Sequence, residues 1–481
     1  MMKGESLHNG KESVESNIQL TLPFGSWDEM DVRRKNIISS PKSGGSSDID
    51  AKPYLKDLGT EIVEKRLPIQ FTSNFGEHVH RWAPYIQGFS ASFVQSMLER
   101  YRDDYMSPVV LDPFAGCGTV LVQAKLNGYR SIGTELNPLL QFIADTKVNS
   151  WDVDPEFLWE FFLSIPRASR AAAPEFLKSE RQFDKGVLTN LEFLKGGIDS
   201  LPSETDRQEK AKRLILLAFS SILIDCSNLK RSPCLGYAKD KKVPAESPWK
   251  LMERKVKHIC EDLVVLQGGF KRNIFLESKT ILANAMEYKH KRKFDLIITS
   301  PPYMNGLDYV MNYKVEMAWL GFTKGSKEAK KIKDSMVVCD NVSKGLIRMF
   351  AQSDHKYTND WLDEIKSSIA ENIERRGNYR RKDMPHIVHK YFDDMYRVMK
   401  NVVQSLKPKG RFILVVGDSL IADVYVPTDL LLARMGKELG LTIERIEKAR
   451  NRRSGQVRSY RLRETILTLR KGRGNKCVSN K

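Results

Sequence analysis

Cysteine is scarce in this chain of 481 residues, and the 6 that occur are scattered along it without a CxxC pair. That pattern excludes a disulfide framework. The nearest approaches to a metal site, His258-x-Cys260 and His386-x-x-His389, lack the further ligands that zinc requires, so we expect no bound metal. The sequence contains no signal peptide and no apolar run of membrane-spanning length. We therefore expect a cytoplasmic protein.

Acidic residues are in short supply relative to basic ones. Lys and Arg together number 78 and Asp and Glu 60, which gives a formal net charge of +18. Such an excess favours a polyanionic partner such as a nucleic acid. A basic soluble protein without special affinity is the alternative. The length corresponds to two or three domain-sized pieces.

A glycine-containing loop follows the first clear strand. Val109–Leu111 is a short apolar run, and a helical pattern begins at Thr119. The glycines between them allow the backbone to approach a ligand closely at the start of that helix. The spacing matches neither the dinucleotide-binding nor the P-loop pattern. The next strand, Arg130–Thr134, ends at Glu135, where a carboxylate suits a pair of ribose hydroxyls.

A second loop begins where the apolar run Phe294–Ile298 meets Thr299-Ser300-Pro301-Pro302-Tyr303. Proline fixes φ and removes an N–H donor, so we expect backbone carbonyls there that point outward without a local partner. With the ring of Tyr303 beside them, these acceptors form a clamp for a flat base that carries an amino group. A simple strand-ending loop is the alternative.

These two loops together resemble a known family. Asp112–Gly118 (Asp-Pro-Phe-Ala-Gly-Cys-Gly) is similar to the cofactor loop of S-adenosylmethionine-dependent DNA methyltransferases. Thr299–Tyr303 is similar to the catalytic motif of their amino-methyltransferase branch, in the form typical of cytosine-N4 enzymes; adenine-N6 enzymes more often begin this motif with Asp or Asn. The stretch from His80 to Ser90 resembles the methionine-side motif, and Ile281–Ala285 lies where a side chain reads the adenine amino group.

The resemblance implies a set of site residues. Cofactor-binding residues would be Phe89, Asp112, Pro113, Phe114, Gly116, Gly118, Glu135 and Asn284, the last in place of the usual Asp. Catalytic residues would be Ser300, Pro301, Pro302 and Tyr303. The Ser300 side chain and the carbonyl after it would accept the hydrogens of the exocyclic amine. Tyr303 would stack on a base flipped out of the duplex.

The same resemblance predicts an α/β, Rossmann-like methyltransferase fold with a mainly parallel central sheet, a closing antiparallel hairpin and a helical insertion. The predicted segments are a disordered or loosely attached tail (1–65), the cofactor half (66–150), a mainly helical insertion that is a candidate for target recognition (151–275), the catalytic half (276–335), an insertion over the active face (336–385) and the C-terminal strands and helices (386–475). Leu441–Ile446 and Glu464–Leu469 form the predicted hairpin.

Arginine gathers near the end of the chain. From Lys448 to Arg463, 7 of 16 residues are basic and none is acidic, and we expect a loop between the last two strands. With no acid to offset the charge, phosphate contact is the favoured role for a set of four side chains, Arg450, Arg452, Arg453 and Arg458. A solvated charged loop is the alternative. A weaker basic candidate spans 375–382.

The leading functional interpretation is a site-specific DNA methyltransferase. It would transfer a methyl group from S-adenosylmethionine to N4 of cytosine in double-stranded DNA, in a restriction–modification system with a cognate endonuclease as a candidate partner. The alternatives are an adenine-N6 DNA methyltransferase, an RNA base methyltransferase, and a catalytically silent nucleic-acid-binding subunit. The intact Asp112, Glu135 and Ser300–Tyr303 argue against the silent subunit.

Overall fold

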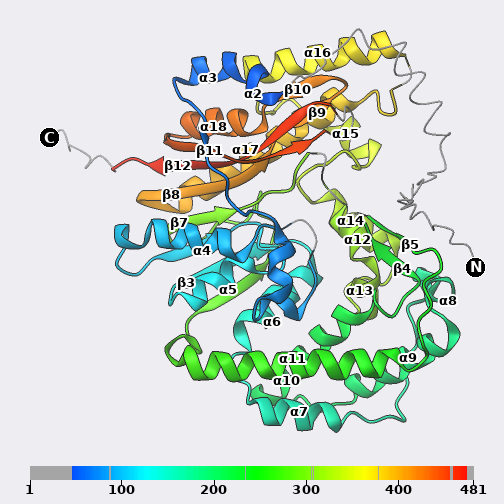
Figure 1. Ribbon diagram of the computed structural model, residues 1–481. Coiled ribbons are helices and arrows are strands. Elements are labelled where there is room, and N and C mark those ends of the chain that lie inside the picture. The colour runs from blue at the N-terminus through cyan, green and yellow to red at the C-terminus, as the bar shows by residue number, and fades with distance from the viewer. Residues whose placement is uncertain are drawn as a thin grey trace, which may run out of the picture. The chain divides into compact units, whose positions relative to one another are not determined.

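A computed structural model gives the structure of the chain (Figure 1). It describes residues 46–85, 88–232, 234–304, 306, 308–377, 379–454 and 459–473.

An eight-stranded sheet forms the centre of these residues, in the order β1-β11-β12-β8-β7-β2-β3-β6 (Figure 1). Neighbouring strands are parallel except at β12, which is antiparallel to both β8 and β11. The strands are β1 (Val63–Glu64), β2 (Val109–Asp112), β3 (Arg130–Glu135), β6 (Ser278–Leu282), β7 (Phe294–Thr299), β8 (Leu406–Gly417), β11 (Leu441–Arg453) and β12 (Arg461–Lys471). The expected α/β, Rossmann-like methyltransferase fold is confirmed.

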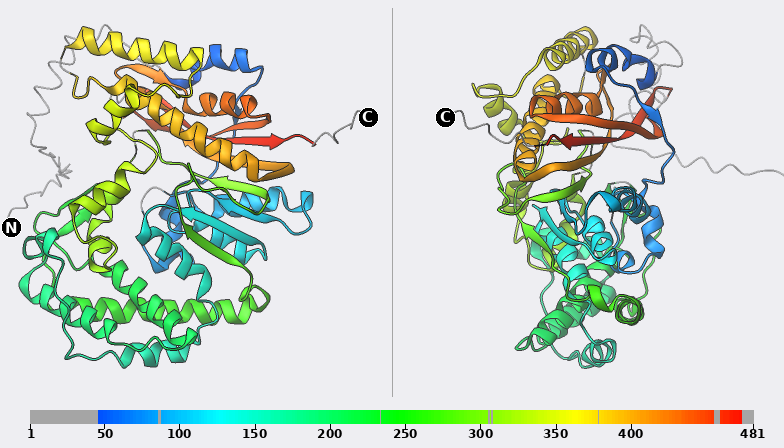
Figure 2. Two further views of the ribbon diagram at one scale, coloured as in Figure 1. Left: turned by 180° about the vertical axis from the view of Figure 1, so that it is seen from behind. Right: turned by 90° about the vertical axis from the view of Figure 1, so that its left-hand side faces the viewer.

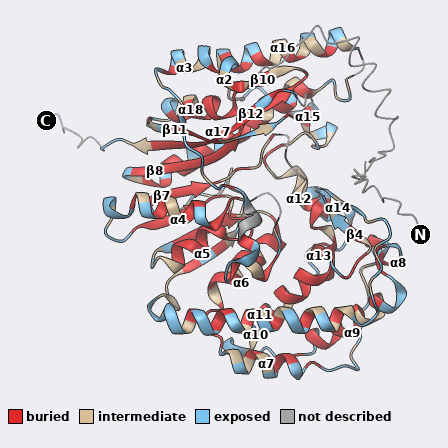
Figure 3. Cartoon of the chain, viewed as in Figure 1, coloured by how far each residue is buried: buried red, intermediate tan, exposed pale blue. Residues whose placement is uncertain are grey.

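Helices cover both faces of this sheet because its strands are apolar on both sides. In β2 the alternate residues enter different hydrophobic clusters: Val110 packs into one, and Val109 and Leu111 pack into the other. The first cluster includes α4 (Ala91–Arg100), α5 (Thr119–Leu126) and α6 (Pro138–Asn149). The second includes α17 (Met384–Ser405) and α18 (Thr428–Glu438). β2 and β7 are buried along their whole length, and Figure 3 shows buried residues along the strands in the middle of the sheet.

The parallel strands all end at one edge of the sheet. β2 ends at Asp112, β3 at Glu135, β6 at Leu282 and β7 at Thr299. The cofactor-like loop, the acidic strand end and the Ser-Pro-Pro-Tyr loop therefore emerge side by side, at the edge where α/β sheets bind their ligands.

The closing hairpin is longer than the sequence predicts. β11 continues to Arg453 and β12 begins at Arg461, and residues 455–458 lie outside the described residues. Arg450, Arg452 and Arg453 therefore lie on a strand, and the predicted loop position for them is wrong. Arg458 cannot be placed because it falls in the gap. The sequence analysis missed this part of the strand because its side chains are polar and basic. They do not show the apolar face by which a strand is recognised.

Residues 46–65 are part of the folded unit, so the prediction of a disordered or loosely attached tail is wrong from residue 46 onward. They form α2 (Ser47–Asp50), α3 (Lys52–Leu58) and β1. β1 pairs with β11 in parallel, and the ring of Tyr54 packs edge-on against Trp361 at 4.8 Å between centroids. A composition rich in Ser, Asp and Lys gave no sign of these contacts, which depend on partners about 300 to 400 residues away.

Between α6 and β6 the chain is mainly helical and forms the lower part of Figure 1. Its helices are α7 (Pro155–Leu163), η4 (Glu175–Leu177), α8 (Ser179–Gln182), α9 (Lys185–Asp199), α10 (Asp206–Ile222), α11 (Ser247–Gly269) and η5 (Lys271–Asn273). The sequence analysis identified no strand here. The structure adds a short antiparallel hairpin of β4 (Leu229–Arg231) and β5 (Leu235–Tyr237).

The segment 336–385 was predicted to cover the active face, but its helices lie elsewhere. Its first residues, Met336 and Val337, line the pocket described below. Its helices α15 (Lys344–Ala351) and α16 (Asp360–Arg376) pack against α17, and both views in Figure 2 show α16 at the top of the molecule. Buried apolar residues at helical spacing, such as Ile365 and Ile369, explain this packing onto the helix layer.

The remaining elements are short. They are η1 (Phe71–Gly76), η2 (His80–Trp82), η3 (Arg102–Asp104), α12 (Tyr309–Asn312), α13 (Lys314–Trp319), α14 (Ser326–Asp334) and the hairpin of β9 (Ser419–Ile421) and β10 (Val424–Val426).

A fully buried arginine, Arg463, joins β12 to neighbouring segments through ion pairs and hydrogen bonds. Arg463 on β12 pairs with two carboxylates, Asp429 at 3.0 Å and Asp418 at 3.2 Å, and all three side chains have 0% exposure or nearly so. Its Nη1 also donates to the Ser47 carbonyl at 2.7 Å, and its Nη2 donates to the Tyr425 hydroxyl at 2.8 Å. Burial, and after it the charge of Asp429, raise the pKa of Asp418 well above its usual range.

Arg463→Met should lower the free energy of unfolding by about 3–5 kcal/mol, because it leaves two buried acids without their cation. Arg470→Met is the matched control on the same strand: Arg470 is 42% exposed and lies 3.8 Å from Glu444, so its loss should cost less than about 1 kcal/mol. Denaturant unfolding of both variants measures the two values. Equal losses would contradict the importance of the buried cluster.

Candidate active site

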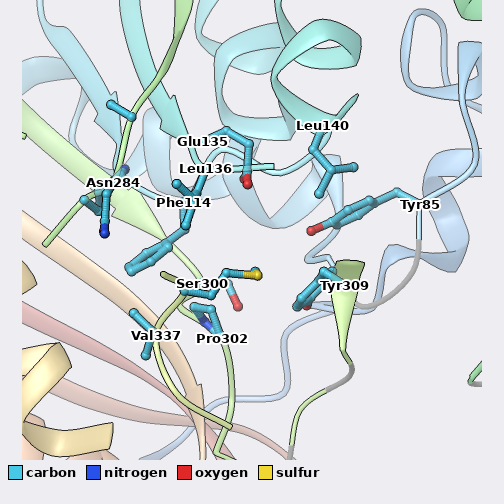
Figure 4. A pocket seen from close by; sticks show the side chains of 14 residues that line it. Tyr85, Phe114, Glu135, Leu136, Leu140, Asn284, Ser300, Pro302, Tyr309 and Val337 are labelled. Atoms are coloured by element: carbon cyan, nitrogen blue, oxygen red, sulfur yellow. The ribbon is translucent and has the colours of Figure 1, made fainter. Parts of the chain in front are cut away.

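A pocket of about 550 Å³, including its open mouth, lies at the carboxyl edge of the sheet (Figure 4). Its lining comes from the ends of β2, β3, β6 and β7, from α12 and from the segment before α15. The lining residues are Tyr85, Pro113, Phe114, Glu135, Leu136, Leu140, Ala283, Asn284, Ala285, Ser300, Pro302, Tyr309, Met336 and Val337. Its position, outside the carboxyl ends of parallel strands, is where open α/β sheets bind their ligands.

The glycines of the first loop are required by its geometry. Gly116 has φ +51°, and a Cβ there would lie 2.6 Å from the Tyr85 hydroxyl. Gly118 has φ +86°, and its Cβ would lie 3.0 Å from that of Ala144 in α6. Both positions combine a left-handed backbone with close packing, which only glycine tolerates. The loop can therefore turn tightly from β2 into α5 and bring Pro113 and Phe114 to the pocket wall.

Glu135 is fixed by the backbone at the end of β3. One of its carboxylate oxygens accepts from Gly116 N at 2.9 Å and the other from Asn137 N at 2.8 Å. Burial raises its pKa, and these backbone hydrogen bonds oppose the rise. Figure 4 shows the carboxylate directed into the pocket, with Ser300 and Pro302 on the opposite side. A carboxylate has about four acceptor sites, so the backbone donors leave capacity for a ligand.

Asp112 does not line the pocket, although the resemblance implied a role in cofactor binding. It is 2% exposed and accepts from Thr299 Oγ1 at 2.6 Å and from Phe114 N at 3.0 Å. Asp112 thus joins the end of β2 to the end of β7 and positions both loops. Burial raises its pKa to about 7.

Contacts with neighbouring elements hold the second loop, Thr299–Tyr303, in place. The expectation that its carbonyls lack local partners is wrong for Pro302, whose carbonyl accepts from the Tyr391 hydroxyl at 3.0 Å. Ser300 and Pro302 line the pocket, whereas Pro301 and Tyr303 do not. The Tyr303 hydroxyl donates to Glu464 at 2.5 Å. Burial and the Glu464 charge raise the pKa of Tyr303, which keeps its hydroxyl protonated.

Two of the arginines expected at phosphates are engaged inside the protein. Arg450 Nε donates to Glu464, and Arg452 Nη2 donates to the Asp418 carbonyl. The guanidinium of Arg452 also lies 5.7 Å from the centre of the Tyr303 ring. The assumption that no acid offsets this charge is therefore wrong, because Glu464 on the facing strand does so. Arg453 is exposed.

Of two further residues expected to bind the cofactor, one lines the pocket and the other does not. Asn284 lines the pocket; its Nδ2 donates to the Ser335 carbonyl at 3.1 Å, and its Oδ1 accepts from Met286 N at 3.0 Å. Phe89 is absent from the wall. It is 7% exposed and packs edge-on against Phe93, with 5.5 Å between the ring centres.

Several lining residues were missed by the sequence analysis. Tyr85 and Tyr309 face each other across one end of the pocket, with nearly parallel rings and 6.3 Å between their centres (Figure 4). Tyr85 belongs to the quoted N-terminal motif, and Tyr309 lies six residues after Tyr303, so proximity to the motifs was an available signal. Leu136 and Leu140 follow Glu135 closely. Met336 and Val337 carry no such signal.

Across the described ranges no group of three or more His, Cys, Asp or Glu side chains is arranged to hold a metal ion. Among the helices that the structure describes, none is both long and apolar enough to cross a membrane.

Comparison with known proteins shows similarity to type II methyltransferases over most of the chain. M.BsoBI of Geobacillus stearothermophilus is 23% identical over 450 residues, which cover 83% of this chain and 86% of that protein. M.AvaI of a Nostoc species is 24% identical over 416 residues, covering 79% and 82%. M.MjaII of Methanocaldococcus jannaschii is 35% identical over 158 residues, covering 30% and 28%. No protein-family profile matches. The similarity supports a methyltransferase.

Solved structures match more weakly. TrmN from Thermus thermophilus aligns with a TM-score of 0.25 and 11% identity, covering 79% of this chain and 48% of that one. The rRNA methyltransferase aviRa from Streptomyces viridochromogenes aligns with a TM-score of 0.30 and 9% identity, covering 85% and 96%. At these low scores neither structure bears on the function of this chain.

Asp112→Asn should flatten the dependence of stability on pH. The raised pKa means that folded Asp112 holds a proton that the unfolded chain loses near pH 4, so wild-type stability falls as pH rises through about 7. Asn keeps an acceptor for Thr299 and cannot ionise. Between pH 5 and pH 8 the wild type should lose about 2–3 kcal/mol more unfolding free energy than the variant. Urea titrations at both pH values test this, and parallel losses would refute it.

Proposed function

We propose that the pocket binds S-adenosylmethionine and that the protein methylates N4 of cytosine in double-stranded DNA as part of a restriction–modification system. The observation that carries the proposal is that Glu135 and Ser300 line the same pocket from opposite sides. Glu135 suits ribose hydroxyls and Ser300 suits an amine, so both groups are within reach of one bound molecule. The similarity to type II methyltransferases supports the methyl-transfer part of this proposal.

The residues present fit the proposed donor. Glu135 would accept hydrogen bonds from the two ribose hydroxyls, with its orientation already fixed by Gly116 and Asn137. Asn284 would lie beside the adenine, and Phe114 and Leu136 supply apolar walls for it. S-adenosylmethionine supplies a methyl group on a sulfonium that is a good leaving group, so the protein's part is mainly to position the acceptor.

The acceptor amine would enter beside Ser300. The nitrogen lone pair of an exocyclic amine is delocalised into the base, and acceptors for its two hydrogens favour a geometry in which that lone pair is presented. The Ser300 side chain and the Pro301 carbonyl are proposed for these roles. Tyr303 holds the loop through Glu464, and its half-buried ring is the surface on which we propose that the flipped base stacks.

Cytosine is favoured over adenine by Ser300, since the resemblance links Ser at the start of this motif to cytosine-N4 enzymes. Adenine-N6 transfer uses the same amine chemistry and is the rival. The exposed Arg453, on the same hairpin as Arg450, remains a proposed contact to DNA phosphates.

Nucleoside mass spectrometry of DNA from a host that expresses the protein tests the proposal. N4-methylcytosine should appear with the wild type and be absent with Ser300→Ala. N6-methyladenine in its place would move the function to adenine. A wild type that modifies neither base in DNA would overturn the proposed function.

Glu135→Ala and Ser300→Ala should separate donor binding from transfer. Loss of hydrogen bonds to a charged group costs about 1.5–3 kcal/mol, so Glu135→Ala should raise the Kd for S-adenosylmethionine by about ten- to a hundredfold. Ser300→Ala should leave that Kd nearly unchanged and lower kcat by roughly 10²-fold or more, as for removal of a positioned hydrogen-bonding group. Calorimetry and a transfer assay give both values. The reverse pattern would mean that the two walls are misassigned.

A further inference from the structure

A second, larger hollow lies beside the candidate active site. It has a volume of about 1200 Å³, including its open mouth. One wall comes from η4, α8 and β5 of the helical insertion, and the other from α12, α13 and α14, which follow the Ser-Pro-Pro-Tyr loop. Figure 1 shows these two groups of elements next to each other on the right of the molecule. We call this hollow the basic groove.

All charged side chains in the described lining of the basic groove are positive. Its lining includes five cations, Lys178, Arg181, Lys314, Lys330 and Lys333, and no Asp or Glu among the described residues. Lys333 pairs with Asp308 at 2.6 Å and Lys330 approaches Asp334 at 3.7 Å, whereas no ion pair is found for the other three within the described part of the chain. Two flat or flexible apolar side chains, Tyr237 (52% exposed) and Met311 (46% exposed), lie among them.

The groove lies near the donor pocket, with a third cavity that shares lining residues with each of them. This cavity has a volume of about 370 Å³ and shares Pro302, Tyr309, Met336 and Val337 with the donor pocket. The same cavity shares Lys333 with the basic groove. A chain that lay in the groove would therefore lie close to the pocket that Ser300 and Pro302 line.

The two walls are fixed to each other by a buried ion pair. Arg231 of the β4–β5 hairpin pairs with Glu316 of α13; their side chains are 9% and 5% exposed. Arg231 also donates to the Asn312 carbonyl, at 3.0 Å from Nε, and Leu235 N donates to Asn312 Oδ1 at 2.7 Å. The groove is thus built in advance of any partner, with an insertion hairpin held against the helices that follow the catalytic loop.

We propose that the basic groove holds the sugar–phosphate backbone of the DNA strand that carries the target base. This inference rests on the proposed function and assigns the surface that delivers its substrate. Lys178, Arg181 and Lys314, for which no ion pair is found among the described residues, suit phosphates. The exposed Tyr237 ring, with the Arg181 guanidinium 5.4 Å from its centre, suits a sugar or an unstacked base. The arginines on β11 fit this role less well, because Arg450 and Arg452 already have partners inside the protein.

The test neutralises the three groove cations for which no ion pair is found among the described residues, as K178Q/R181Q/K314Q in the full-length protein. The control, K271Q/K289Q/K291Q, removes the same charge from exposed lysines that precede β6 and β7, at the opposite edge of the sheet. Binding of a labelled duplex is measured at three salt concentrations. The slope of log affinity against log salt should shrink by about 0.9 per lost phosphate contact, up to roughly 2.7, in the groove variant alone.

The outcomes separate the two proposals. An unchanged slope in the groove variant, or equal changes in both variants, overturns the groove assignment while wild-type DNA binding leaves the proposed function intact. A wild type that binds RNA and no duplex overturns both. Donor affinity measured by calorimetry should be the same in all three proteins; a loss of donor affinity in the groove variant would mean that the substitutions deform the pocket, and that result also counts against the assignment.

Discussion

The hydrogen bond between Thr299 and Asp112 is the contact on which the candidate site depends. It joins the carboxyl ends of β2 and β7 at 2.6 Å inside the protein, where Asp112 is 2% exposed. From these two ends start the glycine loop that shapes the Glu135 side of the pocket and the loop that carries Ser300. A shift of one strand end against the other would move the proposed donor relative to the proposed acceptor, and positioning on the ångström scale governs such reactions.

A second layer of contacts supports the acceptor side. Glu464 of β12 accepts from Tyr303 and from Arg450, while Tyr391 of α17 donates to the Pro302 carbonyl. Strands and helices far apart in the sequence therefore fix the same five-residue loop. On its other side the loop is followed by α12 to α14, one wall of the basic groove. The proposed chemistry and the proposed DNA path thus share one rigid frame.

Much of the fold was predictable from the sequence, because buried parallel strands are short apolar runs that end at loops. Val109–Leu111 and Phe294–Ile298 became β2 and β7 with shifts of one residue. Contacts across the sheet were not predictable. Arg450 faces Glu464 only through the register of β11 with β12, and Ser47 meets Arg463 across the whole chain. The groove cations come from segments more than 100 residues apart, so no local pattern could reveal them.

Hydrogen–deuterium exchange with and without S-adenosylmethionine tests the central claim that the two loops form one donor pocket. The account predicts slower exchange in the presence of the donor at both 112–118 and 299–304, together with the Glu135 region, since all three border the pocket. Exchange at 386–405 and 461–471 should stay the same. Protection confined to one loop, or found only at the basic groove, would contradict the claim.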